Sequence, residues 1–379
     1  MKFMGYKRAD GRVGVRNYPA VVSTVYCSSS VSSKIAETTG AHLFNHSGGC
    51  GQLEPELDHT RRVLEGVVTH PNIGGVLVVG VGCEQIDAET LASVAVGKPS
   101  RFINIQELGN NESVKQGVAL VKEIMEHIDL TRSEADVSEL IIATQCGSSD
   151  TGSGLASNPT VGVLSDRIVA EGGAVILGET GSLYGAAGLM ARRAATPEIG
   201  KKIIEITDKI EKYSKRMGKS FKEANPTPGN IKSGLTTLVE KSLGGVRKGG
   251  TTTIQGVLDP GEMITGKGLW VMDTSRGLGA CGSADMLASG AQILVYTTGK
   301  GNPVGAYLGP VIKVTATRNT AENLVDIIDF DGSPVLMGEE SIEECAERLF
   351  EKTVRVANGE KVMAEIHGHN VFAIGEIIG

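Results

Sequence analysis

The sequence predicts an α/β fold with mainly parallel sheets, helices on both faces of the sheets, and two Rossmann-like domains. Short apolar runs alternate with amphipathic stretches, which is the pattern of β-α-β units. The chain has 379 residues, of which 40% are hydrophobic, enough for more than one core. Glycine is frequent, at 51 residues, and aromatic residues are scarce, at 4%, which favours many tight turns between strands and helices.

The predicted strands are apolar runs that end at a polar residue or at a cysteine. In chain order they are YPAVVSTVYC ending at Cys27, GGVLVVGVGCE ending at Cys83 and Glu84, ELIIATQC ending at Cys146, GGAVILGE ending at Glu179, GLWVMD ending at Asp273, and AQILVYTTGK ending at Lys300. Their short length, flanking glycines and β-branched content favour strands over helices.

Helical patterns separate these runs. The segment SSSVSSKIAETTG follows the first run, begins with serine caps and is closed by Gly40. From Pro197 to Gly218, apolar residues recur three and four positions apart, which predicts a long helix. The polar stretch 127–139 suggests a boundary, so we place a first α/β domain at 1–134 and a catalytic α/β domain at 135–379. The segment NPTPGNIKSG, 225–234, predicts a structured functional loop or a linker.

Charge and composition exclude several classes of protein. The formal net charge is −7 and no basic stripe with interleaved aromatics is present, so a general affinity for nucleic acid or an anionic membrane is not expected. The N-terminus lacks the apolar core of a signal peptide, and no apolar run reaches the roughly 18 residues that span a bilayer. The six cysteines are widely spaced, so we expect reduced thiols and a cytoplasmic protein.

Thiols and carboxylates follow the predicted strands directly. The carboxyl ends of parallel strands meet at one edge of a sheet, where ligands bind. Five residues hold this position: Cys27, Cys83, Glu84, Cys146 and Glu179. A further thiol, Cys50, lies in the glycine loop HSGGCGQ, four residues after His46. We therefore expect these groups to converge.

Thiol, imidazole and carboxylate groups together suit a divalent iron, manganese or zinc ion, and three thiolates could also hold an iron–sulfur cluster. The candidate metal ligands are Cys27, Cys50, Cys83 and Cys146. A free cysteine also often fills a strand end as a small hydrophobic residue, so a structural role is the alternative for each of them. No CxxC pair is present, which argues against the spacing of a zinc ribbon or a ferredoxin.

Several charged residues are candidates for substrate binding. Lys300 lies in the glycine-rich segment TTGKGNPVG, which is compatible with an anion-binding loop and equally with a plain glycine turn. Arg192 and Arg193 could pair with a substrate carboxylate, and so could Arg16 in the N-terminal basic cluster. A solvated surface position is the alternative for these arginines. Glu84, at its strand end, is a further candidate.

Longer motifs carry a resemblance that runs almost from end to end. They include GYKRADGRVGVRN, NHSGGCG, HPNIGGVLVVGVGCE, QCGSSDTGSGLASNP, ETGSLYGAAGLMARRA, NPTPGN, GLTTLVEKSLGGVRKGGTT and TTGKGNPVG. With these motifs the sequence resembles the catalytic part of the altronate and galactarate dehydratase family, the sugar-acid hydro-lyases. It is also similar to the large subunit of sulfolactate sulfo-lyase, which belongs to the same family and removes sulfite instead of water.

The resemblance implies a lyase that acts on a polyhydroxy acid with the help of Fe²⁺ or Mn²⁺. In family members made as one long chain, a small domain precedes the segment GYxRxDGRxGxRN, whereas here that segment begins at Gly5. We therefore expect the small domain to be a separate partner subunit, and the large chain to form a homo-oligomer. The expected substrate is a sugar acid or sulfolactate.

The chemistry that this resemblance implies assigns roles to the candidate residues. Dehydration next to a carboxylate removes an α-proton and expels a β-hydroxyl, and the enol that forms becomes a 2-keto-3-deoxy acid. The base needs a pKa near the working pH, and we predict His46 for this role with Glu179 as the second candidate. The loop after Cys146 supplies Ser149 for substrate binding and Asp150 as a further catalytic group, and a divalent ion would act as a Lewis acid.

Two other classes of function are alternatives. A non-catalytic metal or iron–sulfur scaffold subunit would keep the cysteines, but it would not need Glu179, Arg192 or the hydroxyl-rich loop SSDTGSG. An oxidoreductase on a dinucleotide fold would need a glycine fingerprint after one of its strands, and none of the predicted strands is followed by one.

Overall fold

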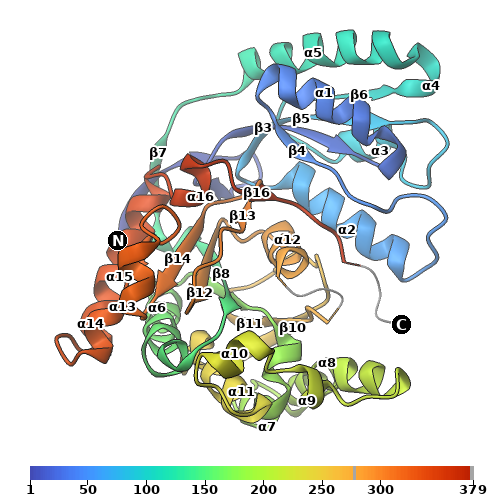
Figure 1. The fold of residues 1–379 in the computed structure, drawn as a ribbon. Coiled ribbons are helices and arrows are strands. Elements are labelled where there is room, and N and C mark those ends of the chain that lie inside the picture. The colour runs from blue at the N-terminus through green and yellow to red at the C-terminus, as the bar shows by residue number, and fades with distance from the viewer. Residues whose placement is uncertain (276–278, 376–379) are drawn as a thin grey trace.

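Two parallel sheets dominate the computed structural model, which describes residues 1–275 and 279–375 (Figure 1). One sheet has four strands and the other has seven, and all strand pairings within both sheets are parallel. The predicted α/β class with mainly parallel sheets is therefore confirmed. Each of the six apolar runs predicted as strands contains one.

The four-stranded sheet comes from the N-terminal part of the chain. In spatial order its strands are β4 (His42–Phe44), β3 (Tyr18–Ser23), β5 (Ile73–Gly80) and β6 (Ser100–Asn104). Helices α1 (Ser29–Thr39) and α5 (Asn110–His127) pack on one face, whereas α2 (Glu56–Thr69) and α3 (Ala88–Ser93) pack on the other. A short helix, α4 (Ile105–Leu108), precedes α5. As predicted, Gly40 ends α1, and its φ of 75° is a left-handed cap.

The seven-stranded sheet comes from the rest of the chain. In spatial order its strands are β10 (Ile254–Leu258), β11 (Gly268–Met272), β9 (Ala174–Leu177), β8 (Ile141–Ser148), β12 (Ile293–Thr298), β14 (Val311–Thr315) and β15 (Phe330–Asp331). Helices α6 (Asn158–Ala170), α8 (Pro197–Arg216), α11 (Leu238–Val246) and α15 (Ile342–Ala357) supply the core of one face, and α12 (Ala280–Ala288) packs on the other. Shorter helices are α7 (Ala187–Ala191), α9 (Phe221–Ala224), α10 (Pro228–Lys232), α13 (Arg318–Asn323), α14 (Ser333–Leu336) and α16 (Met363–Ile366).

The long helix predicted after Pro197 forms as α8. The hydroxyl of Thr196 caps it by accepting from the amide of Ile199, and Pro197 occupies the first turn, where its missing N–H is not needed. Ile203 and Ile206 face the core, in line with the spacing of three and four. Sequence and structure therefore agree on this element to within two residues at its end.

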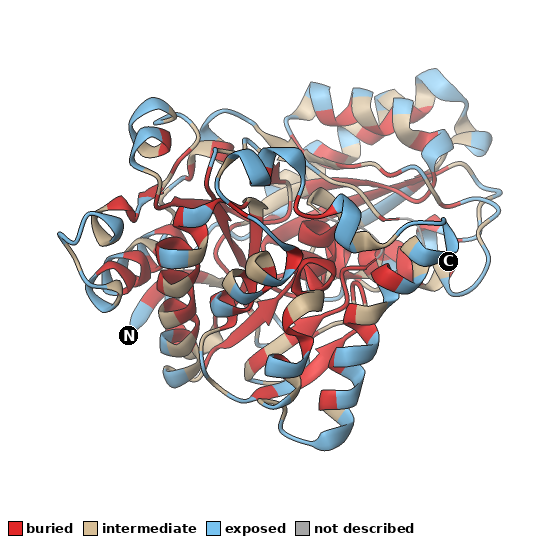
Figure 2. Cartoon of the chain, turned by 60° about the horizontal axis from the view of Figure 1, so that its bottom comes forward, coloured by how far each residue is buried: buried red, intermediate tan, exposed pale blue. Residues whose placement is uncertain are grey.

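Helix α2 joins the two sheets. It lies between them in Figure 1 and packs against α12. A Cβ on Gly66 would lie only 2.3 Å from the carbonyl oxygen of Ala288, so the close approach of the two helices requires glycine there. His59 Nε2 and Asp285 Oδ1 are 2.7 Å apart across this contact, and both side chains are fully buried. Figure 2 shows the buried residues following the strands and the inner faces of the helices.

Two small sheets complete the fold. Strand β1 (Lys2–Lys7) pairs antiparallel with β2 (Val13–Gly14) and β7 (Ser133–Asp136), and β13 (Gly305–Ala306) pairs with β16 (Asn370–Val371). Phe3, Val13 and Val15 pack into the core of the seven-stranded sheet, and a second core cluster contains residues of both large sheets. The division into two Rossmann-like domains at 134/135 stays a prediction. Within the described ranges, no helix is long and apolar enough to cross a membrane.

Candidate active site

The carboxyl edge of the seven-stranded sheet holds a cavity of about 210 Å³. Four residues predicted from the sequence line it: Cys146, Ser149, Glu179 and Lys300. They come from the end of β8 and from the loops that follow β8, β9 and β12. The opposite wall comes from the segment 227–241, with Thr227, Asn230 and Lys241. As expected for the carboxyl ends of parallel strands, these four residues line one cavity, and their functional roles stay predictions.

Glu179 has an unusual backbone conformation. Its φ of 66° and ψ of 37° are left-handed, and it is the only non-glycine residue with positive φ in 1–275 and 279–375. Such a conformation costs about 1–3 kcal/mol and persists only where the surrounding structure holds it. Here it lets Oε2 accept the N–H of Cys146 on the neighbouring strand at 3.0 Å. No N–H or O–H group of a described residue donates to Oε1, and the Cys146 thiol is a further hydrogen-bonding neighbour of the carboxylate, so Oε1 is the oxygen available to a ligand.

Cys146 carries a neutral thiol. Its pKa is raised to about 11, mainly by burial and then by the neighbouring Glu179 carboxylate, whereas Lys248 and Lys241 act to lower it. Its Sγ lies 3.3 Å from Ser149 Oγ. Because the thiolate is the form that attacks electrophiles, this site does not favour a nucleophilic role for Cys146, and its predicted role as a metal ligand stays a prediction.

The wall opposite the sheet is held by a chain of amide contacts. Lys241 Nζ donates to Asn225 Oδ1 at 2.9 Å and to Asn230 Oδ1 at 3.3 Å. Asn230 Nδ2 in turn donates to the carbonyl of Ser149 at 2.9 Å. The segment 225–234, predicted as a functional loop or a linker, is thus a structured wall of the cavity.

Lys241 was missed by sequence reasoning. It lies on α11 in a segment where a lysine at this spacing is typical of a solvated helix face. The only signal was the motif GLTTLVEKSLGGVRKGGTT, which carried the resemblance but no assigned role. Five of the resemblance motifs meet at the cavity, through Cys146, Glu179, Asn230, Lys241 and Lys300.

Asp150 lies next to the cavity loop but does not line the cavity. Its Oδ1 accepts from the amide and the hydroxyl of Ser153, at 2.7 and 2.6 Å, and its Oδ2 accepts from the hydroxyl of Thr317 at 2.5 Å. A Cβ on Gly299 would lie 2.1 Å from its carboxyl carbon, so the side chain is tightly enclosed. The structure thus ties both carboxylate oxygens to the fold, and the catalytic role stays a prediction.

The three predicted substrate-binding arginines lie outside the cavity. Arg16 is buried, and its guanidinium forms a bidentate pair with Glu365 at 2.7 and 2.8 Å. Arg193 donates to the carbonyls of Gly249 and Thr252. Arg192 is exposed at the end of α7. The first two contacts join distant segments of the chain, which is a structural role.

The carboxyl edge of the four-stranded sheet holds a second cavity, of about 250 Å³, lined by His46, Cys50 and Glu56 among others. Both ring nitrogens of His46 are already bonded: Nδ1 accepts the N–H of Gly48 at 3.2 Å, and Nε2 donates to the carbonyl of Ser23 at 3.2 Å. Burial lowers the pKa of His46 to about 4, so the ring is neutral and its nitrogens are occupied. This geometry does not favour His46 as the base.

Glu84 closes the loop after β5. Its carboxylate accepts from the backbone amides of Val81, Gly82 and Cys83 and from the hydroxyl of Thr24. Burial acts to raise its pKa, but these hydrogen bonds outweigh burial and lower it. The structure thus gives Glu84 a loop-closing contact, and its predicted role in substrate binding stays a prediction.

The expectation that all the thiols converge is wrong for Cys146, which follows a strand of a different sheet from the other three. Cys27 and Cys83 lie beyond β3 and β5 of the four-stranded sheet, whereas Cys146 ends β8 of the seven-stranded sheet. Cys27, Cys50 and Cys83 are exposed. Over the described part of the chain, no three His, Cys, Asp or Glu side chains come together in a way that could hold a metal ion. The described side chains alone therefore form no ready-made metal or cluster site, and the predicted cofactor stays a prediction.

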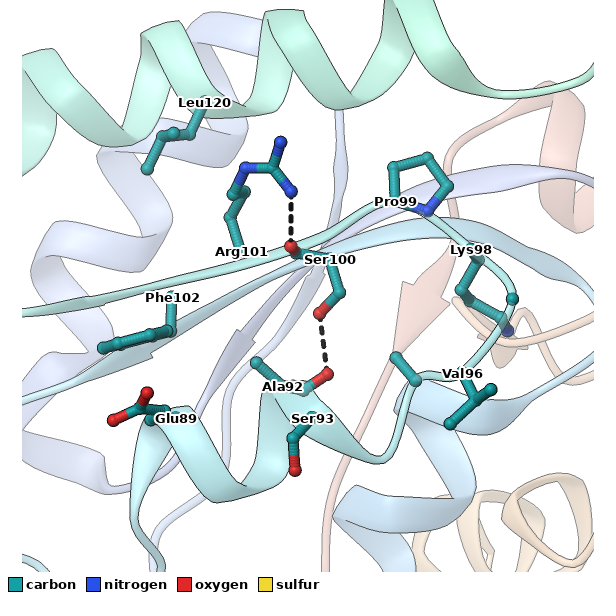
Figure 3. A pocket seen from close by; sticks show the side chains of 12 residues that line it. Glu89, Ala92, Ser93, Val96, Lys98, Pro99, Ser100, Arg101, Phe102 and Leu120 are labelled. Carbon is teal, nitrogen blue, oxygen red and sulfur yellow. Dashed lines mark hydrogen bonds between the residues drawn. The ribbon is translucent and has the colours of Figure 1, made fainter.

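A larger surface hollow near the amino end of β6 is a poor candidate for the active site. It measures about 560 Å³ and lies beside β6 and α3, with Lys98, Arg101 and Phe102 on its wall (Figure 3). Arg101 donates to the carbonyl of Ser100, and Ser100 Oγ donates to the carbonyl of Ala92. Lys98 and Ser100 mark the amino end of β6, whereas ligands bind at the carboxyl ends of such strands.

Known proteins match both parts of the chain. The sequence-family model described as the C-terminal domain of D-galactarate/altronate dehydratase matches residues 137–378. A second family model, described as the second domain of D-galactarate dehydratase/altronate hydrolase, matches residues 5–129. The chain belongs to the galactarate and altronate dehydratase family. As the family resemblance predicted, it is a lyase.

Curated relatives of this family differ in how much of their length the chain covers. The (2R)-sulfolactate sulfo-lyase subunit beta of Chromohalobacter salexigens is 35% identical, and the match covers 98% of this chain and 96% of the relative. The altronate dehydratase of Bacillus subtilis is 33% identical, over 98% of this chain and 77% of the relative. The galactarate dehydratase (L-threo-forming) of Escherichia coli is 33% identical, over 95% and 73%.

Proposed function

We propose that the chain dehydrates a sugar acid of the altronate or galactarate type to a 2-keto-3-deoxy acid in the cavity lined by Glu179. The observation that carries this proposal is a strained, buried carboxylate with one open oxygen, set opposite two lysines, Lys241 and Lys300. The cavity, at about 210 Å³, is smaller than the roughly 300–1,000 Å³ that drug-sized ligands occupy, which suits a small organic acid.

Glu179 is the proposed general base. Its open oxygen takes the proton from the carbon next to the substrate carboxylate, the C–H electrons form the enol double bond, and the β C–O bond breaks. The hydroxyl leaves as water after gaining a proton, and the enol becomes the keto acid. Glu179 replaces His46 as the first candidate because its carboxylate faces a cavity, whereas the nitrogens of His46 are used by the fold.

Lys241 and Lys300 are the proposed partners of the substrate carboxylate. Neutralising that carboxylate makes the neighbouring proton easier to remove, because the negative charge that develops in the enolate is then stabilised. Ser149 and Thr227 add hydroxyl groups to the wall, which can hydrogen-bond a polyhydroxy chain. The cavity thus offers a base, two cations and neutral hydrogen-bonding groups.

Release of sulfite from sulfolactate is the second candidate. The observation that favours it is coverage: the chain matches 96% of the sulfo-lyase subunit but only 77% and 73% of the two dehydratases. The chemistry differs only in the leaving group, since the same α-proton is removed and a C–S bond breaks in place of a C–O bond. Lys241 and Lys300 would stabilise a sulfonate as well as a carboxylate.

One experiment separates these two candidates. The purified protein is incubated in turn with altronate, galactarate and (2R)-sulfolactate, and both keto-acid product and free sulfite are measured. A keto acid without sulfite supports the dehydratase, and sulfite supports the second candidate. If none of the three acids reacts in the presence of the partner subunit described next, the proposed function is wrong.

A separate small subunit is part of this proposal. The matched model of residues 5–129 is described as a second domain, and the sulfo-lyase relative is named as one subunit of an enzyme. We expect the large chain alone to be weakly active and to gain activity when mixed with the small subunit. We also expect a homo-oligomer of the large chain, and a cytoplasmic enzyme, in keeping with six free cysteines.

The predicted Fe²⁺ or Mn²⁺ is kept as a separate prediction, and none of the steps above uses it. Its test is elemental analysis of active protein, followed by treatment with a chelator and re-addition of each ion. Loss and recovery of activity would show a metal requirement that the described side chains do not explain on their own. About four irons with labile sulfide per chain would instead identify a cluster.

A further inference from the structure

Lys248 is a buried lysine next to the proposed base. Its side chain is 0% exposed, and its nitrogen has no hydrogen-bond partner among the described residues. The one ion pair that it forms in this part of the chain is with Glu179, whose Oε2 lies 4.0 Å from Lys248 Nζ. Burying an ammonium without hydrogen bonds is strongly unfavourable unless an opposite charge compensates it. Packing alone therefore does not explain a lysine at this position.

The local backbone delivers the ammonium to the back of the cavity wall. Lys248 follows α11 in the short helix η5 (Arg247–Gly249), and its carbonyl accepts from Ser165 Oγ at 2.7 Å. Gly245 on α11 lies beside the ammonium, since a Cβ there would be at the ordinary contact distance of 3.9 Å from Lys248 Nζ. Lys248 itself does not line the cavity. It can therefore influence bound substrate through the groups that do line the cavity, above all its ion-pair partner Glu179.

We infer that Lys248 is a positioning residue, which holds the Glu179 carboxylate as an anion in the left-handed conformation that faces the cavity. This inference rests on the proposed function. The other titratable groups around the carboxylate include Cys146 on β8, Tyr296 on β12 and the two cavity lysines, Lys241 and Lys300. Cys146 and Tyr296 are neutral, because burial raises the pKa of each. Lys241 is shared with two asparagines, whereas Lys248 forms an ion pair with Glu179.

The test is Lys248→Met, with Lys313→Met as the matched control. Lys313 on β14 is also 0% exposed and lacks a hydrogen-bond partner in the described ranges, but it lies 5.7 Å from the ring of Tyr296 and forms no ion pair with Glu179 there. For Lys248→Met we expect kcat to fall by about 10–100-fold, a part of the 10²–10⁴ that a general base supplies, with little change in KM.

The pH profile distinguishes positioning from a merely structural role. Loss of a cation at this distance disfavours the ionised carboxylate, so the acid limb of kcat/KM should move up by about one pH unit or more in Lys248→Met. In Lys313→Met the limb should stay where the wild type has it. An unshifted limb with wild-type kcat in Lys248→Met would overturn the inference.

Thermal unfolding tests the pair without any substrate. Glu179→Gln and Lys248→Met each leave one buried charge without its partner, so each should lower the melting temperature. The double variant removes both charges. Its loss in melting temperature should therefore be smaller than the sum of the losses in the two single variants. Purely additive losses would overturn the inference. Should none of the three acids react with the wild type, the proposed function fails, while this cycle still decides whether Lys248 and Glu179 act as a pair.

Discussion

The carboxyl edges of the two parallel sheets carry similar residues in opposite surroundings. At the four-stranded sheet, Glu84 accepts three backbone amides and a hydroxyl, so the loop itself satisfies the carboxylate. At the seven-stranded sheet, Glu179 accepts one backbone amide and has the Cys146 thiol beside it, and no N–H or O–H group of the described residues donates to its other oxygen. A carboxylate at a strand end therefore indicates a ligand site only when the fold leaves some of its hydrogen-bonding capacity unused.

The thiols of the two edges differ in their exposure to solvent. Cys27, Cys50 and Cys83 are exposed, whereas Cys146 is buried and neutral against Ser149. Exposed thiols suggest reactivity, yet the cavity with a base and two lysines lies at the other edge. We therefore place the chemistry at the seven-stranded sheet, and the predictions below test that placement.

The largest expected effect is that of Glu179→Gln. This change keeps the shape of the side chain and removes the base, so kcat should fall by about 10²–10⁴-fold. The matched control is Glu84→Gln, which changes the same residue type at the other edge and should leave kcat per folded molecule near the wild-type value. Steady-state kinetics on the best of the three acids measures both. A larger loss in Glu84→Gln than in Glu179→Gln would move the active site to the four-stranded sheet.

The thiols should differ in their rate of alkylation. The raised pKa of Cys146 leaves roughly a hundredfold less thiolate near neutral pH than an ordinary thiol has, and burial slows access further. We expect iodoacetamide at pH 8 to label Cys27, Cys50 and Cys83 at least about 100-fold faster than Cys146. Peptide mass spectrometry over time measures each site.

Turnover is measured in the same alkylated samples, so that labelling of each thiol can be compared with loss of activity. Labelling of the three exposed thiols should leave the turnover of the large chain with its small partner intact, unless the partner contacts that edge. Buried Cys345 on α15 is the internal control for a thiol that is protected but far from the cavity. Rapid labelling of Cys146 in the folded protein would contradict the buried, neutral thiol.

The sequence predicted the fold class and four of the ten residues that line the cavity, for a clear physical reason. Residues that end adjacent parallel strands must lie near one another, so Cys146, Glu179 and Lys300 could be placed together from strand pattern alone. The pattern does not reveal which strands share a sheet, and this is why Cys27 and Cys83 were grouped with Cys146. Assignment of strands to sheets depends on contacts between distant segments.

The remaining residues of the site could not be predicted in this way, because their positions depend on such distant contacts. Lys241 reaches the cavity because α11 packs across the loop after β8, and no local pattern encodes that approach. Arg16 resembled a substrate-binding residue until its partner was known, and that partner, Glu365, is 349 positions away in the sequence. Likewise, the bonds of His46 to Ser23 and Gly48 appear only in the folded chain.

Substitution of the two cavity lysines should have an intermediate effect. Lys241→Met and Lys300→Met each remove one cation that we assign to the substrate carboxylate, and a lost hydrogen bond to a charged group is worth about 1.5–3 kcal/mol, or roughly 10–100-fold in kcat/KM. The loss should appear in both kcat and KM, because the cations bind the substrate carboxylate and also stabilise the charge that develops in the enolate. Lys232→Met, an exposed lysine on α10 in the same wall, is the control. Equal kinetics in all three variants would exclude these lysines from substrate binding.

The smallest expected effect on turnover is that of His46→Asn, and its main effect should be on stability. Burial lowers the pKa of His46 to about 4, below the 6.5 of an ordinary histidine. Between these two pH values the ring binds a proton in the unfolded state but not in the folded state. The stability that the neutral ring contributes is present above about pH 6.5 and is lost as the pH falls towards 4. Between pH 7 and pH 4, the wild type should lose about 3 kcal/mol more unfolding free energy than the variant.

Denaturant unfolding at several pH values measures this difference, and kinetics at pH 7.5 measures turnover. If the nitrogens of His46 only tie the loop 46–48 to β3, turnover per folded molecule should stay near the wild-type value. If His46 were instead the base, turnover should fall by about 10²–10⁴-fold while the pH dependence of stability changed little. Because the same variant gives opposite results in the two assays under the two assignments, it decides directly which sheet edge holds the base.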